Sequence, residues 1–324
     1  MGYNGSLMSK AVNNWEARIG RRIKLRDLHI LLAVVQWRSM AKAAKHLAVS
    51  QPAVSQAVSE LERTLGVRLV DRSSEGVEAT AYGHALLRRA LAVFDELRHA
   101  VSDIEFLADP TKGKLHVGCP ESIVAAFLPM LIERFSCRYP QVVVHIEQIH
   151  NVSPNFQELR SRNVDVVLAR VAKSFSADDL DVSPLADDRL VVAVGAHSPL
   201  ARRRKVTLAD LRDQQWVLTP SDAALSSSER QAFEMSGVNL PTAAIVALST
   251  HVRCNLIGTG RFVGVLSASV MRFNAERFSL KALPIELGAD VHPIAIVTLK
   301  NRTLSPPAQL FLEEARCVAR LLTA

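Results

Sequence analysis

The stretch "AVSQPAVSQAVSELERTLG", Ala48–Gly66, decides the fold of the first part of the chain, because its helical repeat carries two different faces. At 100° per residue the apolar side chains fall in one narrow sector, and polar side chains occupy the opposite side. The apolar stripe comprises Val54, Val58, Leu61 and Leu65, and the polar face comprises Gln51, Pro52, Ser55, Gln56 and Ser59. Ser50 is a favourable N-cap and Gly66 a typical helix end, so the stretch predicts one helix with an unexplained polar face.

Two more helices and a hairpin are predicted around this stretch. The spacing of Met40, Ala43, Ala44 and Leu47 predicts a short helix that Ser39 caps. A helix behind the pair is predicted by Leu25, Leu28, Leu31, Leu32 and Val35. Short apolar runs around Ser73, Ser74 and Gly76 predict a small β-wing. Two short helices joined by a tight turn indicate a helix-turn-helix, whose second helix enters the major groove of DNA.

The chemistry and charge of this region favour DNA over a merely solvated helix face. A Gln amide can make a bidentate contact with adenine, and a Ser hydroxyl can bond bases or phosphate. Residues 1–72 hold 12 Lys/Arg against 5 Asp/Glu, so they carry the whole net charge of +7. The basic side chains around the polar face are Lys42, Lys45, Arg63, Arg68 and Arg72. The predicted DNA contacts are Lys42, Ser50, Gln51, Pro52, Ser55, Gln56, Ser59 and Arg72, although Arg72 has the alternative of a surface pair with Asp71 or Glu75.

A long helix without proline is predicted from Thr80 to about Ala108. Its apolar residues are spaced alternately by three and four, which is typical of a coiled-coil seam. The seam comprises Leu87, Ala90, Phe94, Leu97, Val101 and Ile104, and Leu86, Val93 and Leu107 widen it, so contact with the winged module is expected too. The seam predicts a homodimer or homotetramer on a pseudo-palindromic site of double-stranded DNA. "DPTKGK", Asp109–Lys114, is expected to break the helix and act as a hinge.

The remaining two thirds alternate β-branched runs with helical patterns, which predicts α/β architecture with two mostly parallel sheets. The strands are "LHVGCP", "VVVHIEQ", "VDVVLARV", "LVVAVG", "QWVLTP" and "RFVGVLS", and the helical patterns include Ile123–Tyr139 and Ser153–Arg162. Ligands in such folds meet the carboxyl ends of strands. Polar residues at these ends are therefore candidate ligand contacts: Glu121, Ser122, His150, Asn151, Ser153, Arg170, Thr219, Ser221 and Thr250. Each of them has the alternative of being an ordinary cap or loop residue, and an internal pair with Asp165 or Glu147 would equally explain Arg170.

Two parts of the chain resemble the LysR-type transcriptional regulators. The winged helix-turn-helix signature of that family matches at Ala43, Ala44, Leu47, Ser50, Gln51, Pro52, Ala53, Val54, Ser55, Leu61, Glu62, Leu65, Gly66, Leu69, Arg72, Thr80 and Gly83, with Val70 where Phe is usual. "LPMLIERFSCRYPQVVV", "NVDVVLAR", "HSPLARRRKVTLADLRDQQWVL" and "LSPPAQLFLEEAR" are similar to its effector-binding region, whose two Rossmann-like subdomains resemble periplasmic solute-binding proteins. The resemblance implies that Gln51, Pro52, Ser55 and Arg72 approach DNA and that Ser122 contacts a small effector.

The resemblance also implies a domain plan and partners. We expect an extension over 1–23, a winged helix-turn-helix over 24–80, a linker helix and hinge over 81–112, and an effector domain over 113–324. Within the effector domain, subdomain I spans about 113–185 and 290–324, and subdomain II about 186–289. Arg170 suggests an organic acid or other anion as effector, and RNA polymerase is the expected protein partner. The alternative is a redox-sensing regulator that acts through Cys119.

Several other functions lack their sequence signals. No signal peptide or membrane span is evident, which predicts a cytoplasmic protein. The cysteines Cys119, Cys137, Cys254 and Cys317 have neither paired nor metal-ligand spacing, so we expect mostly buried thiols, no metal and no cofactor. "GTGRFVG", Gly258–Gly264, precedes a strand rather than a helix, so it predicts a turn and not a dinucleotide loop. No catalytic constellation is present, and an enzyme is not expected. The effector, the target genes and the direction of regulation stay open.

Overall fold

The computed structural model describes residues 22–74, 76–149, 155–172, 175–221, 224–287 and 293–323. The chain forms two compact units, Met1–Leu97 and Arg98–Ala324. None of the helices in the described segments is long and apolar enough to cross a membrane.

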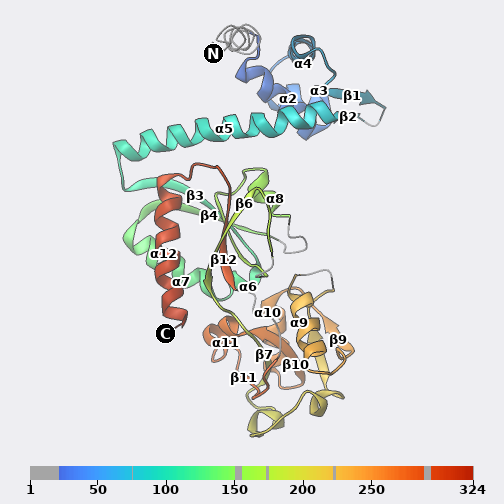
Figure 1. Ribbon diagram of the computed structural model, residues 1–324, viewed down its shortest axis with the longest axis vertical. Coiled ribbons are helices and arrows are strands. Elements are labelled where there is room, and N and C mark those ends of the chain that lie inside the picture. Colours follow the sequence, from blue (N-terminus) through green and yellow to red (C-terminus); the bar gives the residue numbers. More distant parts are fainter. Residues whose placement is uncertain are drawn as a thin grey trace, which may run out of the picture. The chain divides into compact units, whose positions relative to one another are not determined.

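The first unit is a three-helix bundle with a β-hairpin and the start of a long helix (Figure 1). Its elements are α2 (Leu25–Trp37), α3 (Met40–His46), α4 (Gln51–Leu65), β1 (Val70–Ser73), β2 (Gly76–Ala79) and α5 (Ala81–Ala108). The predicted caps are confirmed, because the hydroxyls of Ser39 and Ser50 accept from the backbone N–H of Lys42 and Ala53, and Gly66 ends α4 with φ +72°. The predicted helix stripe is fully buried at Val54, Val58 and Leu61, but Leu65 is 39% exposed because it lies in the last turn, beyond the core.

The hairpin is joined to the helices by specific contacts. The carboxylate of Glu62 on α4 accepts hydrogen bonds from the backbone N–H of Leu69 (2.8 Å) and Val70 (3.3 Å). Gly76 has φ +129°, and a Cβ there would lie 2.7 Å from the carbonyl oxygen of Arg38. The wing therefore needs glycine where its strand passes the end of α2.

The second unit contains two five-stranded sheets, each covered by helices (Figure 1). The first has the order β4-β3-β5-β12-β6, with β3 (Lys112–Cys119), β4 (Gln141–Gln148), β5 (Val166–Arg170), β6 (Leu180–Ala186) and β12 (Ile294–Leu299). Its helices are α6 (Glu121–Val124), α7 (Phe127–Arg138), α8 (Gln157–Arg160) and α12 (Pro306–Thr323). Because side chains alternate along a strand, Leu168 packs with Phe127 and Phe311 on one face, and Ala169 packs near Phe156 on the other.

The second sheet has the order β11-β7-β10-β8-β9. Its strands are β7 (Leu190–Gly195), β8 (Gln215–Leu218), β9 (Ala243–Val246), β10 (Phe262–Ser267) and β11 (Leu280–Ala282). Its helices are α9 (Ala224–Met235), α10 (Thr250–Gly258), α11 (Ala268–Asn274) and the short 3-10 turns η2 (Pro199–Arg202) and η3 (Ala209–Leu211). The chain passes from the first sheet to the second between β6 and β7, and it returns between β11 and β12.

Several expectations about this unit were wrong. Each sheet is mixed, with two parallel and two antiparallel pairings, because the strands next to the crossings run against their neighbours. The helix predicted over Ile123–Tyr139 is two helices, α6 and α7, and the one expected over Ser153–Arg162 is confined in the described part to α8. Residues 112–114 of the expected hinge belong to β3, so only three residues separate it from α5.

Candidate functional site

The polar face of α4 is presented to solvent. Gln51, Pro52, Gln56 and Ser59 are exposed and Ser55 is half-buried, while the other side of the helix is packed in the core. Among the described residues, no hydrogen bond holds the side-chain amide of Gln51 or Gln56. Of the predicted contacts, only Ser50 already has an assigned task, because its hydroxyl caps the helix. The face therefore offers free amide donors and acceptors at the start of a rigid helix.

The basic residues around this face fall into two groups. Arg63, which was not among the predicted DNA contacts, is paired with Glu60 through two hydrogen bonds of 3.0 and 2.5 Å. The bonded Arg63 also lowers the pKa of the Glu60 carboxyl. Lys42, Lys45, Arg68 and Arg72 are exposed, and within the described segments none of them forms an ion pair. For Arg72 the pair with Asp71 is absent there, while Glu75 lies outside the described residues.

The apolar seam of α5 divides into a buried and an exposed half. Leu87 and Ala90 are 6% and 2% exposed and, with the partly buried Phe94, they pack in the core of the first unit. Leu87 and Ala90 are therefore not available to a second copy, contrary to the expected seam, and Phe94 is available only in part. Leu97, Val101 and Ile104 are 46%, 56% and 67% exposed, and the neighbouring Leu107 is 81% exposed. In this later half every seam residue leaves apolar surface uncovered, and Val93, which flanks the earlier half, is 44% exposed.

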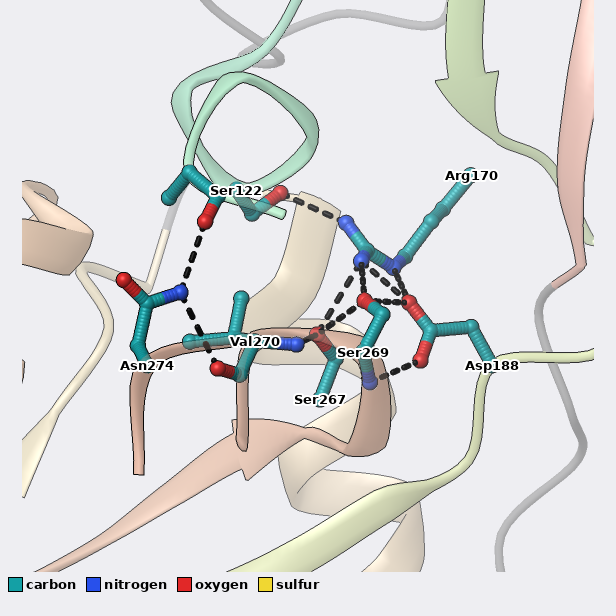
Figure 2. A network of polar contacts seen from close by, with 8 residues as sticks. Ser122, Arg170, Asp188, Ser267, Ser269, Val270 and Asn274 are labelled. Carbon is teal, nitrogen blue, oxygen red and sulfur yellow. Dashed lines mark hydrogen bonds and ion pairs between the residues drawn. The ribbon is translucent and has the colours of Figure 1, made fainter. Parts of the chain in front are cut away.

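In the second unit, Ser122 and Arg170 meet in a buried polar cluster, which we call the Arg170 cluster (Figure 2). It comprises Ser122, Arg170, Asp188, Ser267 and Ser269. Arg170 Nη1 donates to the hydroxyl of Ser122 at 2.6 Å, and Arg170 Nη2 donates to the hydroxyls of Ser267 at 3.0 Å and Ser269 at 3.2 Å. Ser122 follows β3 and Arg170 ends β5 of the first sheet, whereas Ser267 ends β10 of the second sheet and Ser269 lies in the first turn of α11. The cluster therefore ties the two sheets together.

Asp188 neutralises the guanidinium of this cluster. Arg170 Nε donates to Asp188 Oδ2 at 3.0 Å and Arg170 Nη2 bonds the same oxygen, while Ser269 donates to the carboxylate from its backbone N–H and its hydroxyl. The side chains of Arg170 and Asp188 are 7% and 2% exposed. Neither pairing expected for Arg170 occurs, since Asp165 instead bonds Arg302 at 2.9 Å. Asp188 lies where the chain crosses between the sheets, so a buried ion pair marks the crossing.

Glu121 and Thr219 also have internal partners. The carboxylate of Glu121 accepts from the Ser249 hydroxyl at 2.9 Å and from the His251 backbone N–H at 3.2 Å, so it fastens α6 to the start of α10. Thr219 donates its hydroxyl to Glu229 at 2.6 Å, and Arg253 donates to the same carboxylate at 3.0 Å. Burial raises the pKa of Glu229, against the opposing effect of Arg253. As the structure stands, both predicted contacts serve the fold.

The other predicted effector residues are scattered. Ser221 is exposed after β8, and Thr250 is buried in the first turn of α10, where it lines a separate cavity. His150, Asn151 and Ser153 lie outside the described residues. Among the members of the predicted set that the structure describes, only Ser122 and Arg170 are hydrogen-bonded to each other.

Sequence reasoning missed Asp188, Ser267 and Ser269. Ser267 had a local signal, because a serine that ends a strand and precedes a helix is a typical N-cap, and its hydroxyl accepts from Val270 N–H. Asp188 lies in an ordinary acidic pair before a strand, with nothing local to distinguish it from a surface loop residue.

Cys119 is placed in the core and not at a cavity edge. It is fully buried among Leu115, Val117 and other residues of the first sheet, and burial raises the pKa of its thiol to about 12. Because the thiolate is the reactive form, this environment disfavours the redox alternative. All four cysteines are free: Cys119 and Cys254 are buried as expected, Cys317 is half-buried and Cys137 is exposed.

Comparison with known proteins assigns both parts of the chain. Residues 25–84 match the model "Bacterial regulatory helix-turn-helix protein, lysR family", and residues 108–320 match "LysR substrate binding domain". The transcriptional dual regulator GltC of Bacillus subtilis is 28% identical, covering 90% of this chain and 96% of its own. GbpR of Azospirillum brasilense, an HTH-type transcriptional regulator, is 26% identical, covering 94% and 89%. In fold, the chain is similar to CbnR, with 24% identity, TM-score 0.62, and 92% and 99% of the two chains covered.

Proposed function

Because the chain belongs to the LysR family of transcriptional regulators, we propose that the polar face of α4 reads base edges in the major groove of promoter DNA. As a member of this family, the protein is a DNA-binding transcriptional regulator with an effector-binding domain. The observation that carries the proposal is the pair of exposed amides, Gln51 and Gln56, on a helix whose other side is locked in the core. Lys42, Arg68 and Arg72 supply the phosphate contacts.

The experiment selects a preferred site from random duplexes with the full-length protein and measures affinity for that site against a scrambled duplex. We expect Gln51→Ala to reduce the ratio of the two affinities by about ten- to a hundredfold, the discrimination that one bidentate contact supplies. Gln36→Ala is the matched control, because Gln36 is an exposed glutamine on α2. If neither Gln51→Ala nor Ser55→Ala changes the ratio of the affinities for the selected and the scrambled duplex, the proposal is contradicted.

We further propose that the exposed half of the α5 seam pairs two copies of the chain. Leu97, Val101 and Ile104 repeat at coiled-coil spacing and are about half exposed or more, which supports self-association through this surface. Ile104→Lys should shift the protein toward monomer in sedimentation velocity and weaken binding to a two-half-site duplex. Glu96→Lys is the control, since residue 96 lies about 100° away from residue 97 around the same helix. Equal association of both variants excludes the seam.

For the effector we propose an anion that competes with Asp188 for Arg170 and bonds Ser122. Exchanging a protein carboxylate for a ligand carboxylate at the crossing would alter the contact between the two sheets, and thereby the pairing of the DNA-binding units. The experiment screens organic acids by thermal shift on the full-length protein and on Ser122→Ala. Hits that lose affinity in this variant support the assignment, and hits that bind both proteins equally contradict it.

The remaining proposals follow from the family. We assign DNA reading to residues 24–80 and effector binding to residues 113–324, and we place the protein in the cytoplasm, where promoter DNA and RNA polymerase are. Like its relatives, which are regulators, it is proposed to act without catalysis.

A further inference from the structure

A cavity of about 520 Å³ lies in the second unit between helices of its two halves. One wall is made by the end of α6 and by α7, beside the first sheet, and the other by α10 and α11, beside the second. Its volume is in the range of small-molecule sites. The described residues that line it include Thr250 but neither Ser122 nor Arg170, so the cavity is separate from the Arg170 cluster.

Much of the lining is apolar. Ala126 and Cys254 are almost fully buried, and Val124, Met130 and Phe278 are among the other apolar residues of the lining. The ring of Phe278 is held by an edge contact with His251, with ring centroids 5.2 Å apart, and by the guanidinium of Arg277, 5.3 Å from its centroid. Burial raises the pKa of the Cys254 thiol to about 11, so the thiol is uncharged at neutral pH. A compact ring would replace water against this surface.

Two polar atoms in the lining have unused bonding capacity. Asn274 donates from Nδ2 to the carbonyl oxygens of Ala125 (2.7 Å) and Val270 (3.1 Å), which fixes the orientation of the amide. Its oxygen points away from both carbonyls in Figure 2. Within the described segments, neither this oxygen nor the hydroxyl of Thr250, a residue only 4% exposed, has a hydrogen-bond partner. A ligand that carries an O–H or N–H group would satisfy them.

The charges of the lining balance. Glu133 on α7 and Arg277 after α11 are both exposed, and neither is in an ion pair with any described residue. The lining therefore holds one carboxylate and one guanidinium, whose charges offset each other. Both charged side chains are exposed to water, while the buried part of the lining is apolar. A charged ligand would lose hydration there without a buried ionic partner, so an uncharged ligand fits best.

We propose that this cavity is a second small-molecule site, which takes a compact uncharged compound with an aromatic or alicyclic ring and a hydroxyl or amide N–H. Because the ligand would contact helices from both halves of the unit, it would stabilise the arrangement in which both walls are present. The Asn274–Ala125 hydrogen bond already joins the two walls beside the cavity.

The test uses full-length protein and three test compounds of similar size: benzyl alcohol, phenylacetate and benzylamine. Saturation-transfer NMR and calorimetry should show benzyl alcohol binding in the millimolar range, at least about tenfold more tightly than the anion or the cation. Preference for either charged compound, or absence of benzyl alcohol binding, overturns the proposal.

Variants then locate the bound compound. Cys254→Phe fills the cavity from one wall and Met130→Trp from the other, and each should abolish binding in protein that retains its native circular dichroism spectrum. Thr250→Val should weaken it about fivefold, the effect of one hydrogen bond, and Thr259→Val, at the exposed end of the same helix, should have no effect. Binding that survives both filling variants overturns the proposal.

One further variant separates this site from the proposed effector site. Ser122→Ala should leave benzyl alcohol binding unchanged, because Ser122 does not line the cavity. Loss of binding in that variant assigns the compound to the Arg170 cluster and overturns the second site, without affecting the proposal for DNA.

Discussion

The polar face of α4 and the Arg170 cluster are both built largely from small polar side chains, but the chain assembles them in opposite ways. The face comes from nine consecutive residues, 51–59, on a single helix, and its side chains look outward. The cluster comes from segments as distant as Ser122 and Ser269, and its charged side chains are almost completely buried. Loss of a residue should therefore affect recognition in the first region and stability in the second.

The largest expected effect lies in the cluster. Asp188→Ala leaves the guanidinium of Arg170 buried without its carboxylate, and we expect the free energy of unfolding to fall by about 3–5 kcal/mol. Urea denaturation followed by circular dichroism measures it. The double variant Arg170→Met, Asp188→Ala is the control and should recover part of the loss, because no unpaired charge remains. If Asp188→Ala lowered the free energy of unfolding by less than about 1 kcal/mol, the Arg170–Asp188 pair would not be buried as described.

Glu62 tests whether the DNA-binding unit also depends on contacts between separate elements, because this residue of α4 bonds the backbone at the start of the wing. Its carboxylate accepts the N–H groups of Leu69 and Val70, so Glu62→Ala should cost about 1–3 kcal/mol in the first unit. Hydrogen exchange of these two amides should accelerate. Glu60→Ala is a matched control on the same helix, and its exposed pairing with Arg63 predicts little change. If Glu62→Ala and Glu60→Ala changed stability equally, apolar packing alone would hold the wing against the helices.

Glu314 on α12 is a second contact between distant segments, and its contribution to stability should depend on pH. Hydrogen bonds from Arg134 and Arg138 lower the pKa of this buried carboxyl below its ordinary 4.5. A carboxyl with a lowered pKa stabilises the fold above its ordinary pKa, and this contribution is lost as the pH falls through the lowered value. Glu314→Gln should therefore cost about 1–2 kcal/mol at neutral pH, discounted for the exposed arginines, and the difference from the native chain should shrink in acid. A difference independent of pH would show that the cost is one of packing.

The smallest effect is expected at the local cap. Ser50→Ala removes the acceptor for the N–H of Ala53 and should reduce stability by about 1 kcal/mol. Ser50→Gly should destabilise less than Ser50→Ala, because glycine is a better N-cap residue than alanine. Ser74→Ala, in the exposed hairpin turn, is the reference variant and should leave stability unchanged. Should Ser50→Ala abolish specific DNA binding while stability is unchanged, the hydroxyl contacts DNA directly rather than capping the helix.

The parts of the fold that follow local rules could be predicted from the sequence. The helices of the first unit, their caps at Ser39 and Ser50, the wing and the turn at Gly258–Gly264 all depend on residues within a few positions of one another. Predictions were wrong where contacts with distant segments determine whether a residue is buried or which element it joins. Leu87 and Ala90 fit a coiled-coil seam as well as a core, and only their packing against the first unit distinguishes the two. Ile245 and Val246 form the end of β9 because they pair with Val217 and Leu218 of β8, far away along the chain.

The candidate sites show the same division. Free amides on α4 could be inferred from helical periodicity, whereas the partner of Arg170 could not, because a carboxylate 18 residues away is no more distinctive in sequence than the nearer Asp165. The cavity beside Thr250 had no sequence signal, since its walls come from four helices that lie in two segments far apart along the chain.

By itself the sequence determined the helix-turn-helix and the polar outer face of α4, because helical periodicity and capping act over a few residues. It also determined that the net positive charge lies in the first 72 residues of the chain, because charge depends on composition alone. Only the tertiary structure decided that Asp188 neutralises Arg170, that Leu87 and Ala90 of the α5 seam are buried and that a cavity lies between α7 and α10. These features depend on which side chains lose water together, and that depends on contacts between segments far apart along the chain.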